Sequence, residues 1–208
     1  MTVVMVACAN GIASTDVGDG SIVEQDGARD VLANPDSPTT QDGPSPVDES
    51  GACAQKVVIN ELLVDGASEW VELYNASTCS VLLGGWNIKY RSKDDAAGGA
   101  TYLFGSGESI PSKGFFLIAT STYSGTKDAT FNGGFGNAGG QVGLIDKSSK
   151  TVDAVGYGTG TAGLYTEGSP ATLPATNKSM GRSSDGVDTD NNKNDFASFN
   201  TPTPGAAN

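Results

Sequence analysis

Short β-rich segments separated by turn residues fill the chain from residue 56 onward, and this pattern most restricts the possible fold. The turn dipeptide Asp65-Gly66 and the polar run at 147–150 each lie between two such segments, which predicts two hairpins. No segment shows a convincing helical period. About seven or eight short strands with frequent turns predict an all-β, antiparallel β-sandwich. The strands are expected at 56–64, 69–75, 86–91, 101–104, 115–119, 141–146 and 151–157.

The first quarter of the chain lacks this pattern. Residues 1–52 carry nine acids against one arginine, which gives −8 of the chain's net charge of −12. Their apolar residues are scattered, so they cannot bury enough surface to offset ~1–2 kcal/mol of backbone ordering per residue. We therefore expect a disordered acidic linker over 9–52 and a folded domain over 53–208. The alternative for the linker is a poorly patterned strand region.

Composition excludes several classes of function. The chain contains no histidine, which rules out Ser–His–Asp and Cys–His catalysis and ordinary zinc or copper sites. With an isoelectric point near 4.2, the chain repels nucleic acid. No apolar stretch approaches the ~20 residues that cross a bilayer. A binding or structural module is expected rather than an enzyme.

The N-terminal run 1–8 resembles the end of a bacterial lipoprotein signal, in which a cysteine after a small residue is lipidated. The resemblance implies a lipid on Cys8 and an exported lipoprotein anchored at the cell envelope or cell surface. The run is short and no Lys or Arg precedes it, which an upstream start codon or a trimmed start would explain. The alternative is a free thiol in a flexible tail.

Lipidation of Cys8 would leave Cys53 and Cys79 as an even pair. In an exported protein such a pair usually forms a disulfide. It would connect the start of the first strand to the end of the second, closing a loop of about 25 residues worth ~3–4 kcal/mol in the chain-entropy model. The alternative is two buried, reduced cysteines.

Seven short motifs follow one another along the domain. They are Val57-Val-Ile-Asn-Glu61, Glu69-Trp-Val-Glu-Leu-Tyr-Asn75, Leu83-Gly-Gly-Trp86, Tyr102-Leu-Phe104, Ile110-Pro-Ser-Lys-Gly114, Gly140-Gln-Val-Gly-Leu144 and Pro202-Thr-Pro-Gly205. In this order of motifs the sequence resembles a bacterial lamin tail domain over about 53–208. The resemblance implies an immunoglobulin-like β-sandwich, exported and often attached to the cell surface or to secreted enzymes, with no catalytic activity of its own.

Three glutamates on the first two strands could act as a general acid and base in a glycosidase: Glu61, Glu69 and Glu72. Strand alternation predicts that Glu61 shares a face with Ile59 and Leu63. Carboxylates on such half-buried faces usually accept backbone N–H groups or pair with a base, and Arg91 and Arg182 are the candidate partners. The structural interpretation is favoured over catalysis.

Oxygen-bearing side chains alternate near the C-terminus, as in the first half of a calcium-binding loop. The predicted metal ligands are Asp188, Asp190, Asn192 and Asp195. The segment lacks the central glycine, the distal glutamate and the flanking helices of such a loop. The alternative is a series of Asx-turns that satisfy backbone N–H groups.

Six tyrosines could form an aromatic recognition row on the surface, or pack as ordinary cross-strand pairs: Tyr74, Tyr90, Tyr102, Tyr123, Tyr157 and Tyr165. Taken together, the sequence predicts a monomeric, non-enzymatic binding or structural module of the cell envelope. Its partner would be a protein or a surface polymer, with no nucleic acid, and with membrane attachment only through Cys8. No cofactor is expected beyond calcium. The alternative is a carbohydrate-binding or carbohydrate-active domain that uses the three glutamates.

Overall fold

The computed structural model describes residues 53–94, 96–159 and 163–208. The predicted signal remnant at 1–8, the lipidation of Cys8 and the acidic linker over 9–52 lie outside the described residues. No helix in the described part is long and apolar enough to cross a membrane.

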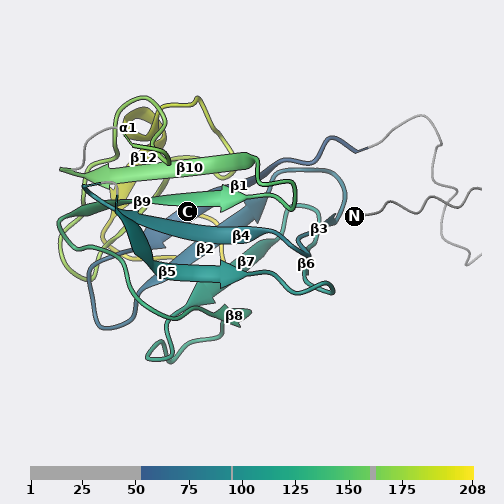
Figure 1. Cartoon of the computed structure of the whole chain (residues 1–208), viewed down its shortest axis with the longest axis horizontal. Helices are drawn as coiled ribbons and strands as arrows, with labels where there is room; N and C mark the ends of the chain where they lie inside the picture. The colour runs from purple at the N-terminus through teal and green to yellow at the C-terminus, as the bar shows by residue number, and fades with distance from the viewer. Residues whose placement is uncertain (1–52, 95, 160–162) are drawn as a thin grey trace, which may run out of the picture. The chain divides into compact units, whose positions relative to one another are not determined.

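Two antiparallel sheets form a sandwich (Figure 1). A six-stranded sheet has the order β12-β11-β1-β2-β7-β8, and a four-stranded sheet has the order β10-β9-β4-β5. A third, two-stranded sheet pairs β3 with β6, and β7–β8 is the one parallel pair of these described sheets. The prediction of an all-β, antiparallel sandwich is confirmed. The elements are β1 (Val57–Leu63), β2 (Trp70–Asn75), β3 (Val81–Leu82), β4 (Asn87–Ser92), β5 (Ala97–Leu103), β6 (Ser109–Ile110), β7 (Phe115–Ala119), β8 (Ala129–Thr130), β9 (Gly139–Ile145), β10 (Thr151–Gly158), β11 (Ser179–Arg182), α1 (Asn192–Asp195) and β12 (Phe196–Phe199).

All seven predicted strands are present, as β1, β2, β4, β5, β7, β9 and β10. Both predicted hairpins are confirmed, because β1 pairs with β2 and β9 pairs with β10 in antiparallel register. The short strands β3, β6, β8, β11 and β12 and the four-residue helix α1 were not predicted. The sequence of β11 is Ser-Met-Gly-Arg, in which a single large apolar residue gives no strand period.

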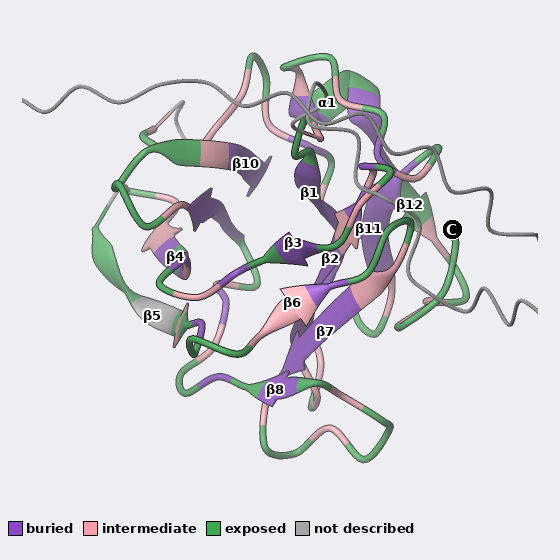
Figure 2. Ribbon diagram, turned by 90° about the vertical axis from the view of Figure 1, so that its right-hand side faces the viewer, coloured by how far each residue is buried: buried purple, intermediate pink, exposed green. Residues whose placement is uncertain are grey.

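The main core fills the space between the two sheets. Figure 2 views the layers from the side, with β10, β4 and β5 on the left and β1, β2 and β7 on the right. Alternate residues of facing strands meet there, such as Val71 and Leu73 of β2 and Val142 and Leu144 of β9. Each large apolar side chain buried in this way contributes roughly 1.5–3 kcal/mol. The interior of the sandwich is therefore filled by side chains.

A bulge in β1 changes which residues face the core. Ile59 lies opposite Leu73, but the next pair is Glu61 with Glu72, so Asn60 is an extra residue in β1. Ile59 belongs to the main core, whereas Leu63 packs in a separate cluster. The prediction that Glu61 shares a face with Ile59 is therefore wrong, because the extra residue reverses the alternation between them.

A disulfide joins Cys53 to Cys79, with their Cα atoms 6.2 Å apart. It connects the segment before β1 to the segment after β2, as the sequence predicted. The bond closes a loop between residues 26 positions apart, which limits the freedom of the unfolded chain.

Candidate functional site

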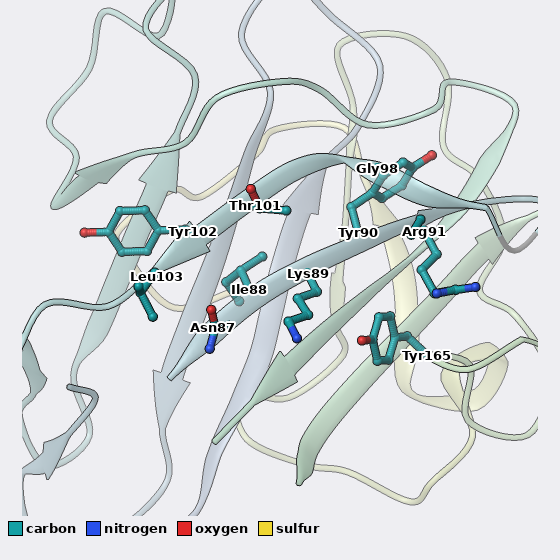
Figure 3. A pocket seen from close by; sticks show the side chains of 11 residues that line it. Asn87, Ile88, Lys89, Tyr90, Arg91, Gly98, Thr101, Tyr102, Leu103 and Tyr165 are labelled. Carbon is teal, nitrogen blue, oxygen red and sulfur yellow. The ribbon is translucent and has the colours of Figure 1, made fainter. Parts of the chain in front are cut away.

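The outer face of the four-stranded sheet carries a groove of about 380 Å³ along β4 and β5 (Figure 3). Ile88 and Tyr90 point into the core, so the alternate residues of β4 point outward. The register pairs Asn87 with Leu103 and Lys89 with Thr101, which brings these four side chains to the same face. The groove therefore has strand residues as its floor.

Tyr165 forms the wall of the groove on the side of β9. Its backbone N–H donates to Oε1 of Gln141 at 2.9 Å, and its ring clusters with Ile145 and Ala154. The ring lies directly over Gly143, where an added Cβ would come within 2.6 Å of a ring carbon. Gly143 is thus required for this close approach. We call residues 163–170 the cover segment, because they lie over β9 and β10 and leave β4 and β5 open.

The helix α1 fixes the cover segment to the sheet. The Oδ1 atom of Asn192 accepts the N–H groups of Gly156 and Glu167, both at 2.9 Å, and its Nδ2 donates to the carbonyl of Ala154 at 2.8 Å. The carboxylate of Glu167 accepts from the N–H of Ala154 at 3.2 Å. The Asn192 side chain is fully buried, so these bonds hold the groove wall in place.

The groove is cationic although the chain is acidic. Of the described residues that line it, the two charged ones are Lys89 and Arg91, and both carry a positive charge. Lys89 is exposed, and Leu103 at the rim is 65% exposed. In Figure 3, Lys89 lies between Asn87 and Tyr165 on the open side of β4. This surface can bind an anionic or oxygen-rich partner.

A second polar region surrounds Arg182, whose side chain is completely buried. Its Nη2 atom donates to both carboxylate oxygens of Asp153 at 3.0 Å, and its Nη1 atom donates to Asp188 and Asp195 at 3.3 Å each. Its Nε atom donates to the carbonyl of Ile59 at 2.9 Å. Because Asp153 is on β10 and Arg182 on β11, this ion pair joins the two sheets. Burial raises the pKa of Asp153 to about 6 against the opposing effect of Arg182.

Arg182 was expected as a partner of the glutamates, but it forms ion pairs with three aspartates. Two of these, Asp188 and Asp195, belong to the predicted calcium set. The backbone N–H of Asp190 donates to Asp188 at 3.2 Å, which is an Asx-turn contact. The side chain of Asn192, another member of that set, bonds instead to the backbone of Gly156, Glu167 and Ala154.

The described acids that lie close enough to share an ion are Asp153, Glu167 and Asp188, with ligand atoms within 4.8 Å of one another. Only Asp188 also belongs to the predicted calcium set. Arg182 already contacts Asp153 and Asp188 there. The calcium site stays a prediction, and these contacts explain the loop without an ion.

Glu61 and Glu72 lie opposite each other on β1 and β2. Residues 203–208, which we call the C-terminal segment, lie over them. Glu61 accepts bonds from the hydroxyl of Ser179 and from the N–H and hydroxyl of Thr203. Glu72 accepts the N–H of Gly205 at 2.5 Å, and burial raises its pKa to about 8. Both carboxylates thus fix the C-terminal segment to the sheet, as the structural interpretation expects.

Glu69 has a different role from the other two glutamates. Its Oε2 atom accepts the N–H of Phe135 at 2.9 Å, which holds the loop before β9. Burial raises its pKa, and the contact with Phe135 opposes this effect. None of the three glutamates lines the groove on β4 and β5.

Of the two alternatives for the tyrosines, a surface row or ordinary packing, the structure favours packing. Tyr90, Tyr157 and Tyr165 are at most 7% exposed, because the first two pack in the main core and Tyr165 packs against the outer face of β9 and β10. Tyr74 pairs with Phe115 across β2 and β7, with ring centroids 5.0 Å apart, which is the cross-strand alternative.

Sequence reasoning also missed the groove itself. The alternation of charge and apolar residues in Lys-Tyr-Arg at 89–91 was a signal for an outward cationic strand face. Nothing in the sequence indicated that residues 163–170 would cover only half of this sheet.

The chain matches a known protein family. A family model described as Lamin Tail Domain matches residues 51–159. The matched region contains β1 to β10 and thus both strands of the groove. The cover segment, Arg182 and the C-terminal segment lie outside it. No curated protein matches the chain.

Proposed function

The chain belongs to the lamin tail domain family, and we propose that it is a non-catalytic module that holds a partner at the cell envelope or cell surface through the groove on β4 and β5. The family match confirms the predicted resemblance and the immunoglobulin-like sandwich. Domains of this type are typically non-catalytic. A sandwich filled by its own side chains is suited to present a surface rather than to enclose a reaction.

The open groove is the observation that carries this proposal. Half of the outer face of the four-stranded sheet is covered by residues 163–170, while Lys89, Thr101 and Leu103 remain accessible beside it. The acids that the sequence offered for catalysis hold backbone groups instead, such as Glu61 with Thr203. The groove thus combines accessible polar and apolar side chains that can contact a partner.

Attachment to a membrane would come from the lipid on Cys8. The acidic linker over 9–52 would then separate the domain from the membrane by about 35–40 Å, if it behaves as a flexible chain of that length. A single acyl chain binds a membrane only reversibly, so stable anchoring requires more than one.

Photo-crosslinking of the full chain on the cells that produce it tests the proposal. A photoreactive residue at Thr101, in the groove, is compared with one at Ser198, an exposed position on β12 of the other sheet. We expect an adduct mainly from position 101, which excess unlabelled protein suppresses and excess Lys89→Glu protein does not. In the same cells, Cys8→Ser should move the protein from the membrane fraction to the soluble fraction.

Equal adducts from both positions would show that the groove is not the binding surface. A Cys8→Ser protein that stays with the membrane would remove the lipid anchor from the proposal and leave the groove in place.

A further inference from the structure

We infer that the groove on β4 and β5 binds a carboxylated polysaccharide, with Lys89 and the Tyr165 hydroxyl contacting a carboxylate and Asn87 and Thr101 contacting sugar hydroxyls. This inference rests on the proposed function and names the class of partner. Three observations support it: the charge of the groove, the positions of its polar groups, and a backbone bridge that already occupies part of the edge strand β5.

Charge complementarity points to an anion. The described part of the chain neutralises its buried cation, Arg182, with three aspartates, whereas Lys89 forms no ion pair with a described residue. Among the described residues, no carboxylate lines the groove. At physiological salt, charges are screened beyond about 8 Å, so the chain's net charge of −12 does not prevent an anion from reaching Lys89.

The backbone of the groove and the ring of Tyr165 are fixed before a ligand arrives. Asn87, Lys89 and Thr101 project from paired strands, and the ring of Tyr165 lies against Gly143. Figure 3 shows the Tyr165 hydroxyl on the groove side of its ring, directed toward Lys89. Binding therefore needs ordering of side chains but not of the strands, and these donors suit a ligand rich in carboxylate and hydroxyl oxygens.

The edge of the sheet favours a polysaccharide over an acidic peptide. β5 is the edge strand of the four-stranded sheet, where an extended peptide would normally add through backbone hydrogen bonds. Thr101, near the end of β5, already forms an antiparallel bridge with Asn132. A peptide ladder along β5 is therefore interrupted, while a sugar chain needs only side-chain contacts and the apolar rim at Leu103.

Binding of defined polymers to the full chain tests the inference. Polygalacturonate, with one carboxylate per sugar, is compared with polyglutamate and with neutral dextran in affinity electrophoresis at two salt concentrations. We expect polygalacturonate to bind, more weakly at higher salt, and dextran not to bind. Lys89→Ala should weaken binding about fivefold. Tyr165→Phe, which keeps the ring over Gly143, should weaken it about threefold. Lys56→Ala, at an exposed lysine that does not line the groove, is the matched control and should change nothing.

Each other outcome overturns part of the inference. Lys89-dependent binding of polyglutamate as tight as that of polygalacturonate would assign the groove to acidic peptides. Polygalacturonate binding that Lys89→Ala and Tyr165→Phe leave unchanged would place the ligand elsewhere. If none of the polymers binds while crosslinking from position 101 persists, the ligand class is wrong and the proposed function stands. Thermal unfolding of each variant confirms that it is folded.

Discussion

Arg182 and Lys89 are both cations on strands, and the structure uses them in opposite ways. Arg182 is fully buried between the sheets and donates to carboxylates from β10 and from the loop before α1. Lys89 is exposed on the outer face of β4 and forms no ion pair with a described residue. Burial therefore makes one cation part of the fold, while exposure leaves the other available to a partner.

The largest effect is expected from Arg182→Met. The substitution leaves Asp153 buried without its partner, and breaking a buried ion pair in this way typically costs about 3–5 kcal/mol of unfolding free energy. Urea denaturation at pH 7 measures the loss. The double variant Arg182→Met with Asp153→Asn should recover part of it, because the charge of Asp153 is then removed, while Asp188 and Asp195 still lack their cation. A loss below about 1 kcal/mol for the single variant would remove the contrast between the two cations.

The same contrast shows what the sequence could predict. Strand periodicity and turn residues identified β1, β2, β4, β5, β7, β9 and β10, since these signals are local. The Arg182 partners were not predictable, because the pairing with Asp153 joins residues 29 positions apart on different sheets. The face of Glu61 was wrong because one extra residue, Asn60, reverses strand alternation and has no signature of its own.

The groove shows the same limit. Lys89 and Arg91 were visible as outward residues of a strand, but the groove depends on Tyr165 from a distant segment. Gly143 permits that contact, yet a glycine in a strand does not indicate which ring will lie on it. Local physics thus predicted the strands, and tertiary packing decided which of their faces stayed open.

Unlike Asp153, Glu72 is buried with no cation of a described residue beside it. It tests whether burial alone keeps a carboxyl group protonated. Its pKa is about 8 in the folded protein and near 4.5 when unfolded, so folded protein keeps a proton that unfolded protein loses. Its contribution to stability is therefore complete below pH 4.5 and is lost as the pH rises through about 8. Relative to the parent protein, Glu72→Gln should gain at least about 1 kcal/mol between pH 5 and pH 9, because glutamine stays neutral.

Urea denaturation of both proteins across that pH range gives the comparison. Burial also raises the pKa of Glu167 to about 8. The Glu72→Gln variant should therefore keep part of the decrease in unfolding free energy with rising pH. Parallel curves for the two proteins would show that Glu72 is already ionised at pH 5 and that its contact with Gly205 outweighs its burial.

The smallest effect on stability is expected at the groove. Lys89→Ala and Leu103→Ser change side chains that are exposed, so each should change the unfolding free energy by less than about 0.5 kcal/mol. The same denaturation series that measures Arg182→Met measures these variants. If either one costs more than about 1 kcal/mol, the groove side chains support the sheet, as Arg182 does. If neither substitution changes the unfolding free energy, the fold does not depend on the lysine and the leucine beside the groove. Binding of a partner would then explain why these side chains are there.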